Sequence, residues 1–483
     1  SSAAIYVKSA DKVFITTASG SENYLANGGV YETIDENNID AVIFSKSDLT
    51  LNGAGTLTIS AAAGHGVVSK DDLVLTSGTY SITAASHGLS GKDSVRIASG
   101  TYDVVSGKDG AHAENKDDES LGFMYIAGGT FNITAGGDGL SAGSYLLVED
   151  GSFTIEAGGG AAAAEVKSDM PGFSPEGTYV TADDETESTK GIKASESLTV
   201  NGGAFYIDSA DDAFHTNGSA VINSGDFEIA TGDDGIHADE NVTVAGGNIS
   251  ITESYEGIEG LSVDITAGEI TIVSSDDGMN AAGGNDSSGV GGFGDDIFAV
   301  TEGAYIKISG GVVNINASGD GIDSNGDLIV TNGEIYVSGP VDSGNSVLDY
   351  NGEGTISGGV FVGAGPSEMT QNFGDTSLQG VMMVSISSAS AGSAVTLTDE
   401  SGTQVLFWTP EKTYSCVIIS CPEIVQGGTY TLSAGEYTTQ ISMESLVYGT
   451  GGMAGAPGGM GDMPGGMGED PEGTGVTPGM MRQ

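Results

Sequence analysis

The sequence predicts an all-β chain whose larger part is a parallel β-helix of three-strand coils, and three observations support that prediction. A short motif returns about every 22 residues, each interval holds three short stretches of alternating apolar residues, and Gly is abundant, at 80 of 483 residues, without a collagen triplet. A fixed period of this length is the signature of a solenoid, in which neighbouring coils bury one continuous core.

The repeated motif places acidic or polar residues before a small residue, then an aliphatic residue, then a polar one, as in "DDGIH" from Asp233 to His237. Two steps are longer than the rest and predict corner insertions near 164–189 and 282–303, because a solenoid accepts extra residues at one corner of a coil. The small residue falls at Gly66, Gly88, Gly110, Gly139, Ala161 or Gly191, Ala213, Gly235, Gly257, Gly278, Gly321 and Gly344.

A second marker is Gly followed two residues later by an aromatic residue and two further on by an aliphatic one, as in "GSFTI" from Gly151. This alternation is that of a strand with one buried face, and the Gly supplies the turn before it. Stacked coils then place the rings in an inward ladder, which we interpret as packed core rather than as an aromatic ligand platform. The rings are those of Tyr80, Tyr102, Phe131, Phe153, Phe205 and Phe227.

The ends of the chain depart from the period. Residues 1–60 are expected to form irregular capping coils before the helix proper, over 61–365. Residues 366–447 carry hairpin-like stretches such as "VMMVSIS" and "QVLFWTP", which predict a small C-terminal β module. Residues 448–483 form a Gly/Met/Pro-rich tail whose composition predicts disorder.

Composition restricts the partners and the location. The formal net charge is −53, with only 14 Lys and Arg, which argues against nucleic acid and anionic lipid as partners and suits cations. No apolar run is long enough for a transmembrane helix. The start at Ser1, without Met, fits a secreted chain trimmed of its signal, or a chosen boundary. Scarce Cys and Lys predict an extracellular or cell-surface protein, and Cys416 and Cys421 form either a local disulfide or two free thiols.

Stacking also places the polar residues of the motif in columns, at the roughly 4.8 Å spacing of paired strands. The residue before the small one gives Asp109, Asp138, Lys190, Asp212, Asp234, Glu256, Asp277 and Asp320, and the position before that adds Asp211, Asp233 and Asp276. The residue two past the small one gives His112, Lys193, His215, His237, Glu259, Asn280 and Asp323.

Stacked carboxylates repel by about 1 kcal/mol per pair even in bulk water, and by more near a protein surface. Raised pKa values, basic partners or bound cations can relieve this repulsion, and Lys307 is the only Lys or Arg between Ala194 and Glu411. The regular recurrence favours cations, and oxygen ligands favour Ca²⁺. Zinc is disfavoured because no Cys lies near and the His residues occur singly. The alternative is that these acids are solvated turn residues, since Asp-Gly is a common turn pair.

The predicted metal ligands are Asp211, Asp212, Asp233, Asp234, Glu256, Glu259, Asp276, Asp277, Asn280, Asp320 and Asp323. Four basic residues among the columns are predicted to contact a ligand: Lys190, Lys193, His215 and His237.

The run "KGIKASESLTVNGG", followed by "SADDAFHTNG", "GDDGIHADENVTVAGG", "ESYEGIEG", "SDDGMNAAGGNDSSG", "SGDGIDSNGDL" and "DSGNSVLDYNG", resembles the bacterial carbohydrate-binding domain-containing protein family over about residues 40–440. The resemblance implies a right-handed helix, a secreted or surface location, bound Ca²⁺, a polygalacturonate-like ligand, and a relation to the pectate lyases of polysaccharide lyase family nine. It implies calcium ligands within the acidic set just given. The resemblance assigns no role in metal or sugar binding to the tail, to His215 or to His237.

Three functions follow as hypotheses. The first is a non-catalytic protein in which Ca²⁺ bridges the protein's acids to an acidic polysaccharide. The second is an extracellular fibre subunit that stacks on itself end to end and is stiffened by Ca²⁺. The third is a pectate lyase-like enzyme, with Lys190 or Lys193 as the base. A Lys among carboxylates has a raised pKa, which suits a counter-charge or a uronate contact better than a base.

Overall fold

The computed structural model describes residues 3–30, 39–164, 188–282 and 299–449. The chain divides into two units, Ser1–Met453 and Ala454–Gln483, and the second unit lies outside the described residues. The predicted tail over 448–483 and the predicted corner insertions near 164–189 and 282–303 fall almost wholly outside them as well.

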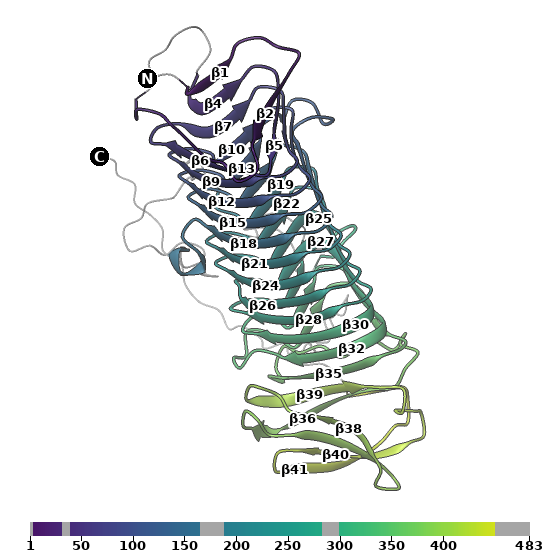
Figure 1. Ribbon diagram of the computed structural model, residues 1–483. Helices are drawn as coiled ribbons and strands as arrows, with labels where there is room; N and C mark the ends of the chain where they lie inside the picture. Colours follow the sequence, from purple (N-terminus) through teal and green to yellow (C-terminus); the bar gives the residue numbers. More distant parts are fainter. Residues whose placement is uncertain (1–2, 31–38, 165–187, 283–298, 450–483) are drawn as a thin grey trace, which may run out of the picture. The chain divides into compact units, whose positions relative to one another are not determined.

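The regular secondary structure of the described residues is almost entirely β-strand. Each regular coil contributes three strands, each paired in parallel with its counterparts in the coils before and after it (Figure 1). The first series is β1 (Ile5–Val7), β4 (Ala41–Ser45), β7 (His65–Ser69), β10 (Leu89–Gly91), β13 (Ala111–Ala113), β16 (Leu140–Ala142), β19 (Ile192–Ala194), β22 (Phe214–Thr216), β25 (Ile236–Val244), β27 (Ile258–Ile265), β29 (Met279–Ala281), β31 (Ile322–Ser324) and β33 (Leu348–Tyr350).

The second series is β2 (Lys12–Thr17), β5 (Asp48–Gly53), β8 (Asp72–Leu75), β11 (Ser94–Ile97), β14 (Phe123–Ile126), β17 (Tyr145–Val148), β20 (Ser197–Val200), β23 (Ser219–Ile222), the later parts of β25 and β27, β30 (Tyr305–Ala317), β32 (Asp327–Ser338) and β34 (Gly354–Ile356). The third is β3 (Glu22–Ala26), β6 (Thr56–Ala61), β9 (Thr79–Ala84), β12 (Thr101–Ser106), β15 (Thr130–Ala135), β18 (Ser152–Ala157), β21 (Ala204–Ser209), β24 (Asp226–Thr231), β26 (Asn248–Glu253), β28 (Glu269–Ser274), the later parts of β30 and β32, and β35 (Val360–Gly365). The prediction of a parallel β-helix is confirmed.

The aromatic ladder lies in the core, as predicted. Tyr80, Tyr102, Phe131, Phe153, Phe205 and Phe227 are all buried, and successive ring centroids lie 4.6–5.3 Å apart in stacked pairs. Offset stacking of rings adds to the free energy gained by burying them. The ladder therefore fixes the register of the third strand series from coil to coil.

At Gly257, a small residue of the motif, the next coil leaves no room for a side chain. A Cβ at Gly257 would lie 2.4 Å from the carbonyl oxygen of Gly278 in the next coil, closer than any side chain is tolerated. The structure also decides between two alternative alignments and corrects another. Gly191, not Ala161, occupies this position, since Ala161 begins a 3-10 helix at Ala161–Ala163. Val347, not Gly344, follows Gly321, because residues 339–346 form a longer connection before β33.

The ends of the helix differ from each other. Strands β1 to β6, within the predicted capping region 1–60 and one residue beyond, already pair in parallel with the next coil. At the other end, β35 pairs antiparallel with β39 (Tyr414–Ser420), which also pairs with β36 (Val381–Ala389). The edge of the last coil's third strand is therefore covered by the C-terminal region.

The C-terminal region contains a four-stranded antiparallel sheet of β38 (Gln404–Trp408), β37 (Val395–Asp399), β40 (Thr429–Ala434) and β41 (Tyr437–Ser442), with β42 (Val447–Tyr448) beside β36. Cys416 and Cys421 are both buried free thiols. In the part of the chain that the structure describes, no helix is long and apolar enough to cross a bilayer.

Candidate functional site

Two columns of polar side chains run next to each other along the first strand series. The strand column is made by the middle residue of each short strand, whose neighbours on either side point into the core. Its members pair in register from coil to coil: Ser90, His112, Ser141, Lys193, His215, His237, Glu259, Asn280, Asp323 and Asp349. The corner column is made by the residue just before the small residue of the motif in each coil. Its members are His65, His87, Asp109, Asp138, Lys190, Asp212, Asp234, Glu256, Asp277 and Asp320.

Acids of the corner column accept a hydrogen bond from the backbone of the next coil. The amide N–H of Asp138 donates to Asp109 Oδ1 at 3.0 Å, and that of Asp234 donates to Asp212 Oδ1 at 3.0 Å. The N–H of Asp320 donates to Asp277 Oδ1 at 2.6 Å. A buried backbone N–H without a hydrogen-bond partner costs free energy, so these carboxylates stabilise the fold by accepting hydrogen bonds at the corner of each coil.

In three coils, the Oδ2 atom of the corner-column acid faces an imidazole of the strand column. Asp109 Oδ2 lies 2.6 Å from His112 Nδ1, Asp212 Oδ2 lies 2.7 Å from His215 Nδ1, and Asp234 Oδ2 lies 3.0 Å from His237 Nδ1. The carboxylates of Asp109 and Asp212 thus contact both a backbone amide and a basic side chain. Burial alone would raise the pKa of Asp109, but its hydrogen bonds with His112 and His87 hold that pKa below its usual range.

Lys190 is the centre of a buried ion-pair cluster. Its Nζ lies 2.6 Å from Asp212 Oδ2 and 2.9 Å from Asp211 Oδ1. Burial would lower the pKa of Lys190, but these two carboxylates raise it well above its usual range. Burial would likewise raise the pKa of Asp212, and Lys190 and His215 lower it instead. Both partners of the Lys190–Asp212 pair are therefore charged at neutral pH.

His237 forms a second closed cluster. Its Nδ1 lies 2.7 Å from Glu259 Oε2 and 3.0 Å from Asp234 Oδ2, and its Nε2 lies 3.2 Å from Asp239 Oδ1. Burial lowers the pKa of His237, but hydrogen bonds to Asp234 and Glu259 outweigh it and raise the pKa to about 12. His237 thus contacts three acidic side chains, while burial and the neighbouring Asp233 raise the pKa of one of them, Asp234, well above its usual range.

After the coil of His237, the columns contain no basic residue, because the next coils contribute only carboxylates and one amide, that of Asn280. Among the described residues, no Lys, Arg or His pairs with Asp277, Asp320 or Asp323. Burial, and then neighbouring carboxylates, raise the pKa of Asp323 to about 8. Burial is the main cause that raises the pKa of Asp320 to about 7. We call the set Glu256, Asp277, Asn280, Asp320 and Asp323 the oxygen-only section.

Within the part of the chain that the structure describes, two buried oxygens of the oxygen-only section have no hydrogen-bond partner: Glu256 Oε2 and Asn280 Oδ1. The amide of Asn280 donates to the other oxygen of Glu256 at 3.0 Å. Burial and the neighbouring Asp234 raise the pKa of Glu256 well above its usual range. One carboxylate oxygen from each of Asp277, Asp320 and Asp323 lies within 4.8 Å of the other two. Such a gathering of oxygens lacks a positive charge.

The structure brings most of the predicted metal ligands together, in separate groups. Asp211, Asp212 and Asp233 meet beside Lys190, Asp234 and Glu259 meet at His237, and Asp277, Asp320 and Asp323 meet in the oxygen-only section. Asp276 precedes Asp277 and is partly exposed.

The four residues predicted to contact a ligand differ in their exposure to solvent. Lys190, His215 and His237 are 6%, 4% and 0% exposed and are held in ion pairs, a placement at odds with sugar contact. Lys193 keeps 23% of its side chain exposed.

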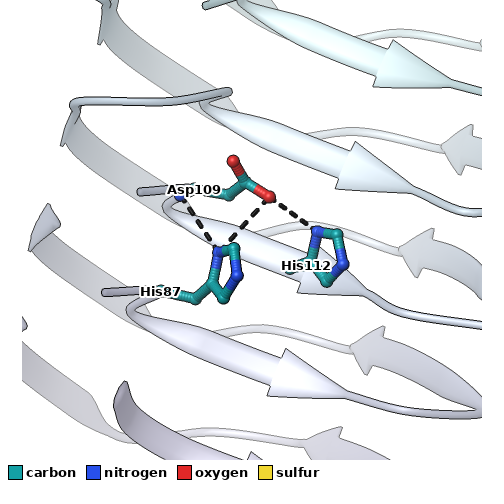
Figure 2. A group of neighbouring side chains, drawn as sticks. All are labelled: His87, Asp109 and His112. Atoms are coloured by element: carbon teal, nitrogen blue, oxygen red, sulfur yellow. Dashed lines mark hydrogen bonds and ion pairs between the residues drawn. The ribbon is translucent and has the colours of Figure 1, made fainter. Parts of the chain in front are cut away.

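Sequence reasoning missed His65 and His87. They occupy the corner position before Gly66 and Gly88, and their rings stack, with centroids 5.0 Å apart; His87 in turn stacks on His112 at 4.6 Å. Figure 2 shows Asp109 between His87 and His112. Extending the corner column by two more coils would have found both residues.

The fold and the columns together define a class of protein: a parallel β-helix that displays stacked ionisable side chains along one of its sheets. Comparison with known proteins is more specific. A family profile described as "Carbohydrate-binding domain-containing protein" matches residues 1–235 and 233–401, and the chain belongs to that family. A curated "Carbohydrate-binding domain-containing protein" from Acetivibrio thermocellus is 40% identical over 85 residues, which span 17% of this chain and 30% of the relative. No solved structure matches the chain.

Proposed function

We propose that this chain is an extracellular or cell-surface, non-catalytic protein that binds an acidic polysaccharide through Ca²⁺ held in the oxygen-only section. Membership of a carbohydrate-binding family supports a polysaccharide as the ligand. The net charge of −53 would repel an acidic polysaccharide in the absence of a bridging cation. A divalent cation shared between protein and uronate carboxylates resolves that repulsion.

The observation that carries the proposal is the replacement of basic partners by oxygens along the two columns. In the coils of Asp109, Asp212 and Asp234, an imidazole faces the corner carboxylate. In the coils of Asp277 and Asp320, the corresponding residues are Asn280 and Asp323, which bring no positive charge. A proton or a metal ion has to take the place of the imidazolium.

Calcium fits this place better than a proton does. It takes about six to eight oxygen ligands from carboxylates, amide carbonyls and water. The section offers carboxylates, a buried carboxylate oxygen of Glu256 and a buried amide oxygen of Asn280 that have no hydrogen-bond partner. Asp277, Asp320 and Asp323 are only partly buried, so ligand positions on the solvent side remain for a uronate carboxylate.

The environment of Lys190 supports a non-catalytic role. A lyase base must be neutral to accept the proton beside a uronate carboxylate. Lys190 is held protonated by Asp212 and Asp211, so it is unsuited to that role.

Polygalacturonate is expected to bind the purified protein in millimolar Ca²⁺ and to dissociate when the Ca²⁺ is chelated. The measurement is affinity electrophoresis in gels that contain polygalacturonate, with a neutral soluble cellulose derivative as the comparison polymer. Equal retardation with and without Ca²⁺ would contradict the bridging role of the cation. Ultraviolet absorbance of the same mixture tests for unsaturated uronate, whose appearance would make the protein a lyase.

Substitutions in the oxygen-only section are expected to weaken Ca²⁺ binding. Asp277→Asn and Asp323→Asn each remove one charged ligand and should raise the Kd for Ca²⁺ by about tenfold or more, equal to about 1.4 kcal/mol or more. Isothermal titration calorimetry measures the change. The matched control is Asp150→Asn, an exposed acid off the columns whose Oδ1 accepts only the Gly151 amide at 2.8 Å. Equal effects at Asp150 and Asp277 would locate the binding elsewhere.

A further inference from the structure

We propose that His87, Asp109 and His112 form a second metal site, for a divalent transition metal that prefers imidazole, such as Zn²⁺. The site lies in the N-terminal half of the columns, several coils before the oxygen-only section, and does not rest on the proposed Ca²⁺ function. His87 and Asp109 belong to the corner column, one coil apart, and His112 to the strand column in β13 (Figure 2).

The three side chains converge on one carboxylate oxygen. Asp109 Oδ2 lies 2.6 Å from His112 Nδ1 and 3.3 Å from His87 Nδ1. One ligand atom from each of the three lies within 4.8 Å of the other two. Ligands of a tetrahedral zinc ion, with bonds of about 2.0–2.2 Å, stand about 3.4 Å apart. Small rotations of the imidazoles about χ2, a soft torsion, can close that difference.

Without a cation, His87 Nδ1 cannot satisfy both of its polar contacts at once. Its Nδ1 faces both the backbone N–H of Asp109, at 3.1 Å, and Asp109 Oδ2, at 3.3 Å. A bare Nδ1 accepts from the amide but then directs its lone pair toward a carboxylate. A protonated Nδ1 donates to the carboxylate but then faces an N–H. A metal ion bound by the carboxylate and one nitrogen of each ring removes this conflict, and it replaces the amide contact of His87 and the hydrogen bond between His112 and Asp109.

The cluster is open where the other His-containing clusters are closed. The side chains of His87 and His112 are 17% and 18% exposed, and among the described residues the Nε2 atoms of both have no hydrogen-bond partner. By contrast, both ring nitrogens of His237 are engaged by carboxylates and its side chain is fully buried. Solvent can therefore reach a metal at His87 and His112 and complete its coordination.

The ligand set also separates the two proposed metals. Two imidazoles and one carboxylate suit zinc and related ions, whereas Ca²⁺ prefers oxygen ligands alone. The net charge of the three groups with neutral rings is −1, which a divalent ion overcompensates and a water or anion ligand can balance. Calcium in excess should leave this site free.

The test is a titration of the full chain with Co²⁺, a spectroscopic substitute for Zn²⁺, in buffer that contains millimolar Ca²⁺. The expected result is one bound Co²⁺ per chain with visible d–d absorption, which added Zn²⁺ abolishes. His87→Gln and His112→Gln should each weaken Co²⁺ binding by about tenfold or more. The matched control is His215→Gln, which should leave Co²⁺ binding unchanged.

Melting curves of the metal-free variants show whether each one folds, and Asp109→Asn supplies a further ligand change that keeps an acceptor for the Asp138 amide. Absence of visible absorption and of retained Co²⁺ with the wild-type chain would overturn the proposal. So would a loss at His215→Gln equal to that at His112→Gln. Loss of Ca²⁺-dependent polygalacturonate binding, with Co²⁺ binding intact, would bear only on the oxygen-only section.

Discussion

Without divalent cations, the protein is expected to lose stability as the pH rises from about 5 to about 8, and Ca²⁺ is expected to remove most of that loss. The cause is the oxygen-only section, where burial and neighbouring carboxylates raise the pKa of Asp320 to about 7 and that of Asp323 to about 8. Because these two acids interact, they titrate as a pair.

The sign follows from the proton balance. In the unfolded chain an Asp loses its proton near pH 3.9, roughly, while in the folded chain Asp320 and Asp323 keep theirs to higher pH. The stabilisation by these protons is complete below the unfolded pKa and is lost as the pH rises through the folded values. For the pair, a loss of several kcal/mol is expected. A bound Ca²⁺ replaces the protons, so the loss should vanish in millimolar Ca²⁺.

Thermal unfolding at several pH values, with a chelator or with Ca²⁺, measures the effect. The double variant Asp320→Asn/Asp323→Asn carries neutral amides and should show a flatter pH profile in chelator. A double variant at two exposed acids, Asp117→Asn/Asp150→Asn, should keep the wild-type profile. A melting temperature in chelator as high at pH 8 as at pH 5 would contradict the prediction.

The fold was predictable because the repeat encodes it directly. The alternation in "GSFTI" and its counterparts indicates which residues face inward, and stacking at a fixed register then follows without knowledge of distant contacts. The corner and strand columns could be predicted in the same way, since the register that aligns Phe205 with Phe227 also aligns Lys193 with His215. Alignment fails where the coil length changes, as at Gly344 and Val347.

The chemistry within the columns was harder to predict. Counting basic residues suggested that the acids lack partners, yet one residue, Lys190, contacts both Asp211 and Asp212 of the next coil. Three more acids contact His237. A sequence gives the position of a side chain in a column but not the direction in which a long side chain reaches, nor its burial. The few basic residues therefore neutralise one half of the columns and leave the other half to protons or cations.

This division gives the two halves of the columns different ion chemistry on one scaffold. Toward the N-terminus, the imidazoles of His65, His87 and His112 stack in sequence, and the carboxylate of Asp109 contacts His87 and His112. Toward the C-terminus, the imidazoles are absent and carboxylates predominate. Because the backbone geometry repeats, the identity of the side chain alone decides which ion each coil suits. Burial and the neighbouring His87 lower the pKa of His65 to about 4, so this imidazole is neutral at physiological pH.

Replacing Lys190 by Met is expected to cause the largest loss of stability among single substitutions in the columns. Lys190 is 6% exposed and its partner Asp212 is fully buried, so the substitution leaves Asp212 without its closest cation. Removing one partner of a buried ion pair costs about 3–5 kcal/mol. Because Lys190 and His215 hold the pKa of Asp212 below its unfolded value, the pair stabilises the fold above that value and loses its effect as the pH falls. The damage from Lys190→Met should therefore be greatest at neutral pH.

Chemical unfolding of Lys190→Met and Lys193→Met at neutral pH and at about pH 4 measures this difference. Lys193 is the matched control, because it lies in the same coil, is partly exposed and approaches Asp138 Oδ2 only to 4.0 Å, so its loss should cost less than about 1 kcal/mol. Adding Asp212→Asn to Lys190→Met should restore part of the stability, since the amide removes the buried charge and its oxygen still accepts the Asp234 N–H. If Lys190→Met is no less stable than Lys193→Met, the acids of this coil are neutralised by something other than Lys190, and a bound cation beside Asp211, Asp212 and Asp233 becomes the better account of that cluster.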